Sequence, residues 1–220
     1  MEYQPFDVKK AAAGFGADLA GIASADRFTE APEGARPSDV LSSAASVIVL
    51  CCGFPLEAAE DNPEGYTAVR NMMVAKMNGI AQKLAKAVQK EGYKAETVPS
   101  VAASLTNGRY RGPISLKHAA VLAGLGRIGK NTLLVNERFG NMLWLSAVVT
   151  DMVLDPDPPA GYETCSPSCR ACISACPAEA LCGDEMSQQA CLGHAFKTVG
   201  GKLEIQCWKC RTACPGFKGI

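Results

Sequence analysis

Cysteine is the residue type in this chain with the clearest capacity for chemistry, because most of its 11 cysteines lie close together near the C-terminus. One run reads Cys-x3-Cys-x2-Cys-x3-Cys-Pro from Cys165 to Pro177, and a second reads Cys-x2-Cys-x3-Cys-Pro from Cys207 to Pro215. Four thiolates spaced in this way can bind an iron–sulfur cluster, and a Cys-Pro pair is typical of runs that serve two clusters. The spacing therefore predicts two [4Fe–4S] clusters and the transfer of single electrons.

The ligands of each cluster can be assigned from the rule that the fourth cysteine of one run binds the other cluster, as in bacterial ferredoxins. The residue three before Cys207 is Glu204, so the first ligand of the second run must lie farther upstream, and Cys191 is the candidate. The first predicted set is Cys165, Cys169, Cys172 and Cys214, and the second is Cys176, Cys191, Cys207 and Cys210.

Zinc and disulfide bonds are the alternatives for closely spaced cysteines. Paired C-x2-C spacings also bind zinc, but a zinc site needs neither the third cysteine nor the two Cys-Pro pairs. Disulfides form in oxidising compartments, and residues 1–10 lack the cationic start and apolar run of an export signal. The iron–sulfur interpretation is therefore preferred.

The cysteine-rich segment divides the chain into two predicted domains. Residues 151–161 are acidic and rich in proline, which indicates a linker or a wrapping loop. The predicted fold class is α+β: a layered α/β domain at residues 1–160 binds a cofactor or substrate, and a ferredoxin-like domain with two [4Fe–4S] clusters follows at 161–220. The second part is too small to depend on a hydrophobic core alone, so the clusters would stabilise it.

The charge and hydropathy of the chain limit its partners. Lys plus Arg and Asp plus Glu both number 22, and the formal net charge is zero. A nucleic-acid-binding surface needs a basic face, so we expect a small-molecule substrate or a redox partner protein, not nucleic acid. No stretch approaches the ~18 uninterrupted apolar residues of a spanning helix, and we expect a cytoplasmic protein that does not bind membranes.

Apolar periodicity predicts that helices alternate with strands in the first 160 residues. The clearest pattern has Met73, Met77 and Ile80 at steps of three and four, typical of an amphipathic helix. Residues 99–113 are polar and are predicted to form a loop. Helices are predicted at residues 6–15, 38–46, 66–91 and 115–123, and strands at 18–23, 47–51, 94–98 and 142–149.

The glycine-rich segment 123–132, with the sequence AGLGRIGKNT, partly matches two phosphate-binding motifs. Its G-x-G-x-x-G pattern would need a preceding strand, whereas a helix is predicted there, and its P-loop pattern has Asn131 where Ser or Thr would bind magnesium. The segment is either a tight turn or a loop that brings backbone close to a cofactor.

One predicted cavity combines this segment with the polar segment 100–111 and faces the clusters. Arginine and lysine side chains could offer charge to a large cofactor or to an anionic substrate, although the arginines could equally be solvated loop charges. Cofactor-binding candidates are Ser100, Arg109, Gly124, Gly126, Gly129 and Lys130, with Arg111 beside them.

The combination of segment 123–132, Phe139-Gly140, Thr150-Asp151 and the cysteine runs resembles the signature of the epoxyqueuosine reductases. The resemblance extends from about Val47 to the end of the cysteine runs. This family and the related reductive dehalogenases imply a cobalamin-binding domain related to flavin nitroreductases, fused to a two-cluster ferredoxin module. The resemblance also implies that electrons pass through the clusters to cobalt, and that Cys191 is the distant ligand.

Two departures from the family affect the expected substrate. The family carries an acidic residue in the loop after the strand that matches residues 94–98, whereas this chain reads Val98-Pro-Ser-Val101 there. The family also continues beyond the clusters into a region that grips transfer RNA, whereas this chain stops six residues after Cys214. We therefore expect a short relative that acts on something other than epoxyqueuosine in transfer RNA.

Two functions remain open from the sequence. The first is a reductase in which the clusters feed electrons to a corrinoid, with FMN as the alternative cofactor, or to a small-molecule substrate. The second is a non-catalytic electron carrier that docks on a partner enzyme. Cys51 and Cys52 are interpreted as buried small hydrophobes, His118 as a surface or packing residue, and His194 as exposed.

Overall fold

The computed structural model describes residues 6–101, 104–106, 109–183 and 185–220. Its centre is a four-stranded sheet with the order β1-β2-β8-β3. Each neighbouring pair is antiparallel: β1 (Leu19–Ser24) with β2 (Ser46–Gly53), β2 with β8 (Leu143–Thr150), and β8 with β3 (Ala95–Val98). The four strands predicted from apolar runs are confirmed, and so is the α+β fold class.

Both faces of the sheet are buried. Successive residues of β2 are apolar, and their side chains point alternately to one face and to the other. Ile48, Leu50 and Cys52 belong to the core under helices α1 and α3. Val47, Val49 and Cys51 belong to the core on the other face, under helix α4. Cys51 and Cys52 are fully buried, as interpreted from the sequence, and burial raises the pKa of both thiols.

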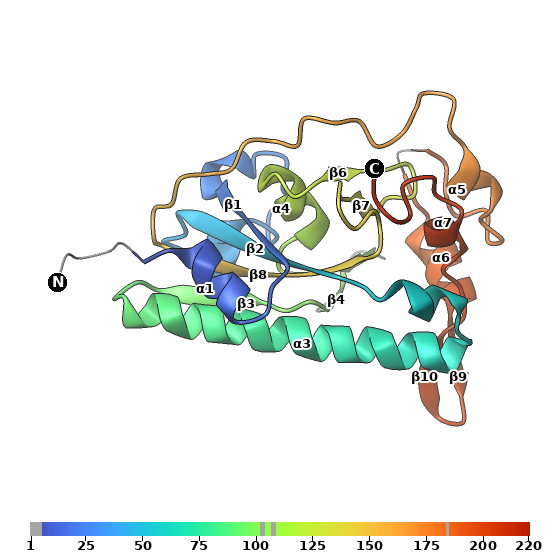
Figure 1. Ribbon diagram of the computed structural model, residues 1–220, viewed down its shortest axis with the longest axis horizontal. Helices are drawn as coiled ribbons and strands as arrows, with labels where there is room; N and C mark the ends of the chain where they lie inside the picture. Colours follow the sequence, from blue (N-terminus) through green and yellow to red (C-terminus); the bar gives the residue numbers. More distant parts are fainter. Residues whose placement is uncertain (1–5, 102–103, 107–108, 184) are drawn as a thin grey trace.

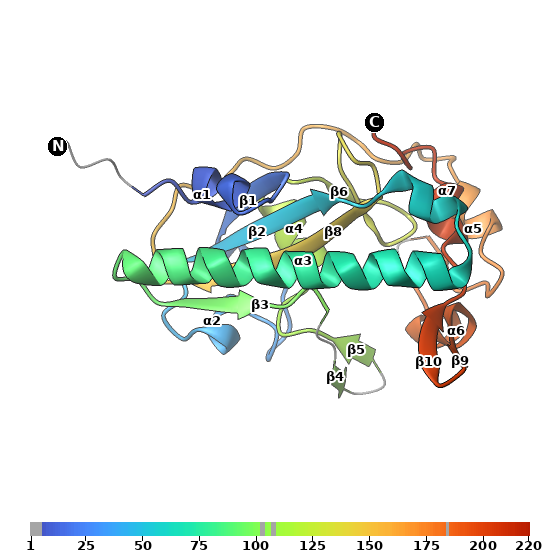
Figure 2. The same ribbon diagram turned by 60° about the horizontal axis from the view of Figure 1, so that its bottom comes forward.

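Helix α3 (Pro63–Lys90) runs along the whole length of the sheet, and its first residues reach the cysteine-rich segment (Figures 1 and 2). Met73, Met77 and Ile80 lie on its buried stripe, as predicted. The helix begins three residues earlier than the predicted Tyr66, because Asn62 accepts a hydrogen bond from the Gly65 N–H and Pro63 occupies the first turn.

Shorter helices complete the two layers. Helix α1 (Val8–Gly14) is capped by Asp7, and α4 (Leu116–Leu122) follows Ser115, both close to their predicted positions. The predicted helix 38–46 is wrong: α2 covers only Pro37–Val40, because Pro37 begins it and Leu41 is already extended. Two 3₁₀ helices, η1 (Ala25–Arg27) and η2 (Leu56–Glu60), follow β1 and β2.

The segment predicted as a polar loop contains a small hairpin. Strands β4 (Ser104–Thr106) and β5 (Arg109–Arg111) pair in antiparallel register, with Ser104 opposite Arg111. Residues 107 and 108 of the predicted loop lie outside the described residues. A second small pair, β6 (Arg127–Ile128) and β7 (Leu134–Val135), follows α4.

The acidic, proline-rich segment 151–161 is a wrapping loop. It crosses the outside of the molecule from β8 to the cysteine runs (Figure 1). Asp157 holds it in place: its carboxylate accepts hydrogen bonds from the Ile22 N–H at 2.8 Å and from Lys9 Nζ at 2.5 Å, and its carbonyl accepts one from Arg27 at 2.6 Å.

The cysteine-rich segment forms short helices and a hairpin at one end of the molecule (Figures 1 and 2). The Trp208 indole stacks on the Tyr66 ring of α3 at a centroid distance of 4.1 Å and donates to the Ala59 carbonyl at 2.9 Å. In the described residues, no helix combines the length and the apolar character that crossing a membrane requires. The elements are α5 (Ala171–Ser174), α6 (Gln188–Ala195), β9 (Phe196–Val199), β10 (Lys202–Ile205) and α7 (Lys209–Thr212).

Candidate functional site

One group of thiols gathers around Cys172, which lies on α5 and is buried. Burial raises the pKa of the Cys172 thiol, and the negative charges of Cys214, Cys165 and Cys169 raise it further. Cys214 is also buried, and burial raises its pKa, whereas hydrogen bonds from the Gly216 backbone and the Asn141 side chain oppose this shift. The four thiols of the first predicted set thus lie close enough to interact electrostatically.

A second group of thiols gathers around Cys210 and Cys191. Burial raises the pKa of Cys210 to about 11, with further contributions from Cys191, Cys207 and Cys176, against the opposing charge of Arg211. Burial likewise raises the pKa of Cys191, and Cys176 and Cys207 add to the shift. Cys182 is exposed and perturbs neither group. Among residues in the described ranges, no three His, Cys, Asp or Glu side chains are arranged to hold one metal ion.

The end of the glycine-rich segment connects the two thiol groups. The Lys130 N–H points at Cys165 Sγ at 3.5 Å, and Lys130 Nζ donates to the carbonyls of Ser166, Pro167 and Cys169 at 3.2, 2.7 and 3.0 Å. The buried Asn131 amide donates to the carbonyl of Cys210, in the other group, at 3.3 Å. Lys130 and Asn131 therefore fasten the two cysteine runs to the first part of the chain.

The three glycines of this segment allow close backbone packing. A Cβ on Gly124 would lie 2.3 Å from the Pro158 carbonyl oxygen, and one on Gly126 would lie 2.4 Å from that of Val135. A Cβ on Gly129 would lie 3.5 Å from Cys165 Sγ. Close packing against the Pro158 and Val135 carbonyls explains why glycine stands at 124 and 126. A role of these glycines in cofactor binding stays a prediction.

We expect replacement of Lys130 with Met to loosen the first cysteine run, because three carbonyls would lose a charged hydrogen-bond donor. Allowing for partial exposure, a loss of about 1–2 kcal/mol corresponds to about fivefold or more in the retention of bound iron. The measurement is the rate at which an iron chelator bleaches the anaerobically purified protein. Lys83→Met, which removes an exposed lysine of α3, is the control, and equal rates for the two variants would contradict this role of Lys130.

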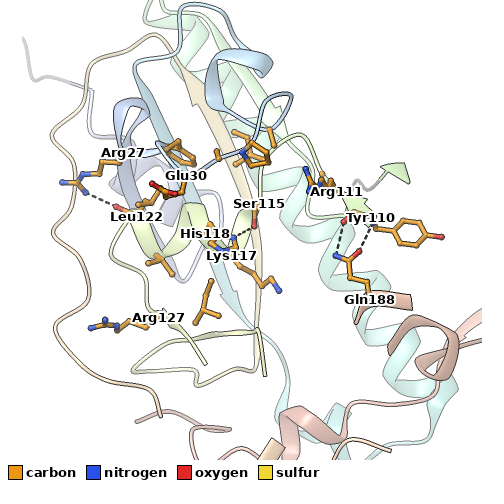
Figure 3. A pocket seen from close by; sticks show the side chains of 18 of the residues that line it. Arg27, Glu30, Tyr110, Arg111, Ser115, Lys117, His118, Leu122, Arg127 and Gln188 are labelled. Atoms are coloured by element: carbon orange, nitrogen blue, oxygen red, sulfur yellow. Dashed lines mark hydrogen bonds between the residues drawn. The ribbon is translucent and has the colours of Figure 1, made fainter. Parts of the chain in front are cut away.

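A cavity of about 800 Å³ lies on the α4 side of the sheet (Figure 3). One of its lining residues, Gln188, belongs to α6, the helix that also carries Cys191. The larger apolar side chains of its wall are those of Phe28, Ile114, Val121, Leu122 and Ile128. Its ionisable lining residues are Arg27, Glu30, Tyr110, Arg111, Lys117, His118, Arg127 and Glu163. This volume and mixed lining suit a small molecule that carries an apolar body and a charged group.

Several charged groups of the cavity already have partners. Arg27 donates to the Leu122 carbonyl at 2.9 Å, and Arg127 forms an ion pair with Glu163 at 2.9 Å. Partial burial lowers the pKa of His118, and the neighbouring Lys117 charge lowers it further. The His118 ring shares a hydrogen bond of 2.7 Å with Ser115 Oγ. His194, by contrast, is exposed, as expected.

Gln188 connects the cavity to the second thiol group. Its side-chain amide accepts from the Tyr110 N–H at 2.8 Å and donates to the Tyr110 carbonyl at 3.3 Å, in the manner of a paired strand (Figure 3). Gln188 lies on α6, less than one turn before Cys191. The hairpin strand β5 is thereby attached to the helix that carries a predicted cluster ligand.

The structure brings together only part of the predicted pocket. Tyr110 and Arg111 from segment 100–111, and Arg127 and Ile128 from the glycine-rich segment, line the cavity. The three glycines and Lys130 are not among its lining residues, and the side chain of Arg109 lies outside the described residues. Ser100 faces α3 instead, where its N–H donates to Asn78 at 2.8 Å.

Three buried polar atoms of the described residues have no hydrogen-bond partner: Ser100 Oγ, Trp144 Nε1 and Asn141 Oδ1. Such atoms are rare in native proteins and are expected to meet a ligand or an ordered water. Arg211, which follows Cys210, lies over the Trp144 ring at 5.8 Å, so Trp144 adjoins the second thiol group.

Comparison with known proteins confirms the resemblance predicted from the motifs. The chain is 37% identical over 112 residues to an epoxyqueuosine reductase of Lactococcus garvieae, covering 46% of this chain and 31% of the relative. It is 32% identical over 184 residues to a tetrachloroethene reductive dehalogenase of Desulfitobacterium hafniense, covering 82% of this chain and 30% of the relative. The chain thus spans about a third of the length of these relatives. No protein-family model matches it.

Solved structures share the fold. An epoxyqueuosine reductase bound to a modified tRNA-Tyr stem loop has a TM-score of 0.68 at 19% identity, covering 96% of this chain and 64% of the other. A reductive dehalogenase described as B12-dependent has a TM-score of 0.73 at 20% identity, covering 94% of this chain and 31% of the other. The expectation that nucleic acid is not a partner rests on two grounds: the zero net charge and the absence of the family's region beyond the clusters. Because one neighbour is bound to a tRNA stem loop, this expectation is not supported.

Proposed function

We propose that this homologue of the epoxyqueuosine reductases and the reductive dehalogenases is a reductase that passes single electrons through two [4Fe–4S] clusters to a cofactor or substrate in its first 160 residues. The observation that carries the proposal is the grouping of the thiols, since Cys172 interacts with the other members of the first set and Cys210 with those of the second. The ligands proposed for the two clusters are the two sets of four cysteines assigned from the sequence.

The surroundings of the thiols suit bound clusters. The Ala180 N–H points at Cys176 Sγ at 3.3 Å, and the Lys130 N–H points at Cys165 Sγ. Backbone N–H groups directed at cluster sulfurs stabilise the reduced state and help to set the reduction potential. When bound, each cluster would supply one-electron transfer, and the thiols would give up their protons to bind iron.

A corrinoid is the cofactor we propose beside the clusters, because a structural neighbour is B12-dependent. The partnerless Ser100 hydroxyl and Trp144 indole N–H could hydrogen-bond its amide periphery, and Arg211 lies over the Trp144 ring. A bound corrinoid would supply a strongly reducing metal centre, and the protein would supply binding and orientation. FMN is the alternative cofactor.

The cavity residues are proposed to bind a small anionic substrate. Arg111 and Lys117 would attract its negative group. His118, whose pKa is lowered by partial burial and by the Lys117 charge, would be neutral near pH 7 and could donate a hydrogen bond. The alternative of a non-catalytic carrier is not favoured, because the named relatives are reductases.

The test is cofactor retention by the anaerobically purified protein. After incubation with cob(II)alamin and desalting, the protein should keep about one corrinoid per chain, because a resident cofactor stays bound during desalting. Trp144→Phe should weaken retention without loss of iron, because it removes the indole N–H and keeps an aromatic ring. A parallel incubation with FMN tests the alternative. If the wild type retains neither, the proposal of a cofactor site is wrong, whereas absence of iron would refute the clusters.

A further inference from the structure

Lys117 lies between the cavity and the second thiol group. Its side chain leaves α4 and lines the cavity (Figure 3). Its Nζ donates to the carbonyl of Thr132. Thr132 has a φ of 58°, which a β-branched residue rarely adopts. The residue before it, Asn131, donates to the carbonyl of Cys210. Lys117 therefore binds the residue that directly follows Asn131, and Asn131 contacts the second cysteine run.

The charge of Lys117 lowers the pKa of a thiol in the second group and of a histidine in the cavity. Burial and the nearby Arg211 charge lower the pKa of Lys117, while the Cys191 and Cys210 thiolates oppose that shift. Reciprocally, the Lys117 charge lowers the pKa of Cys191 against the effect of burial. The same charge lowers the pKa of His118, on the cavity side.

No carboxylate neutralises Lys117 within the ranges that the structure describes. The ion pairs found there join Lys9 to Asp157 and Arg127 to Glu163. Arg211 is the other cation beside Cys210, but it donates to the Asn141 carbonyl and does not line the cavity. A partly buried ammonium without a carboxylate calls for negative charge from a ligand or from a reduced cluster.

We propose that Lys117 is a cation shared between the cavity and the second cluster, so that binding an anion in the cavity and reducing that cluster oppose each other. The inference rests on the proposed function, because it requires a cluster on Cys176, Cys191, Cys207 and Cys210. Reduction adds one electron and hence one negative charge to the cluster, with no bond made or broken. An anion bound to Lys117 neutralises part of the positive charge that favours reduction of the cluster.

Thermodynamic linkage makes the effect measurable from either side. If an anion lowers the potential of the cluster, reduction of the cluster must weaken anion binding by the same factor. We expect a coupling of about tenfold, which corresponds to a fall of about 59 mV for a one-electron couple.

The first experiment compares benzoate with benzamide, which have similar shapes and differ in charge. Anaerobic redox titration with dithionite, followed by electron paramagnetic resonance, measures the two midpoint potentials of the iron-loaded wild-type protein. Saturating benzoate should lower the midpoint potential of one cluster and leave that of the other unchanged. Benzamide should change neither potential. Equal effects of the two compounds, or no effect of benzoate, would overturn the proposal.

The second experiment uses variants. Lys117→Met should lower the potential of one cluster without any ligand and abolish the response to benzoate, whereas Lys117→Arg should retain both wild-type properties. Lys202→Met removes an exposed lysine from the hairpin between Cys191 and Cys207 and should change neither. A purely structural Lys117 would leave the potential of an iron-loaded Met variant unchanged. Failure of the wild type to load iron would instead refute the proposed function, so the two failures are distinguishable.

Discussion

Replacement of Cys191 with Ala is expected to remove one of two clusters and leave the other. Iron and acid-labile sulfide should fall from about eight each per chain to about four, because a cubane cluster held by four thiolates loses one ligand. Cys191 interacts with Cys176 and Cys207, and Cys210 interacts with all three. The thiols that shift the pKa of Cys172 and Cys214, by contrast, all belong to the first set. The loss should therefore be confined to the second cluster.

The matched control for this experiment is Cys182→Ala. Cys182 lies in the same segment but is exposed and belongs to neither set, so its replacement should keep the full iron content. The measurement is iron and sulfide analysis of anaerobically purified protein, with electron paramagnetic resonance of the reduced samples to count the remaining centres. If Cys191→Ala keeps full iron while Cys182→Ala loses it, the distant ligand is Cys182.

The central sheet was predictable because its strands carry their own signal. Residues 47–51 and 142–149 are short apolar runs, and in the structure both are buried on two faces between helices. The start of α3 was placed too late because its start signal, Asn62-Pro63, lies before the first residue of the apolar stripe. The hairpin of β4 and β5 was missed because its strands have three residues each, too short for a periodic pattern.

The grouping of the thiols follows from spacing along the chain, whereas contacts between distant residues could not be predicted. The thiols of each predicted set influence one another, and their binding of clusters stays a prediction. Lys130 was expected to face a cofactor, but its ammonium group contacts carbonyls 36, 37 and 39 residues away. Gln188 meets Tyr110 across 78 residues, and no pattern in either segment indicates the contact.

Lys117 shows the same limit in another form. It lies in the predicted helix 115–123, where a lysine on a helix is usually a solvated surface residue. Only the fold shows that this side of α4 faces a cavity and the cysteine-rich segment. The lysine before His118 in a short, otherwise apolar helix was the one available signal, and it is a weak one.

Replacement of Gly140 with Ala is expected to detach the C-terminal residues from the first part of the chain. Gly140 has a φ of 56°, and a Cβ there would lie 2.2 Å from the Gly216 carbonyl oxygen and 2.5 Å from Phe217 backbone atoms. The next residue, Asn141, donates its N–H to the same Gly216 carbonyl at 3.1 Å. The substitution therefore combines backbone strain with a clash just after Cys214.

The expected cost is about 3 kcal/mol, from left-handed strain and displaced backbone, which corresponds to a fall in Tm of about 6–12 °C for a chain of this size. Displacement of Cys214 should also cost iron from the first cluster. Gly79→Ala is the control: its Cβ would meet nothing within 4 Å inside α3, and the gain in helix propensity should raise the Tm slightly, by about 1–4 °C. Thermal unfolding and iron analysis of both variants, purified without oxygen, measure the two effects. A Gly140→Ala protein with unchanged Tm and iron would show that Gly216 and Phe217 can move without disturbing Cys214.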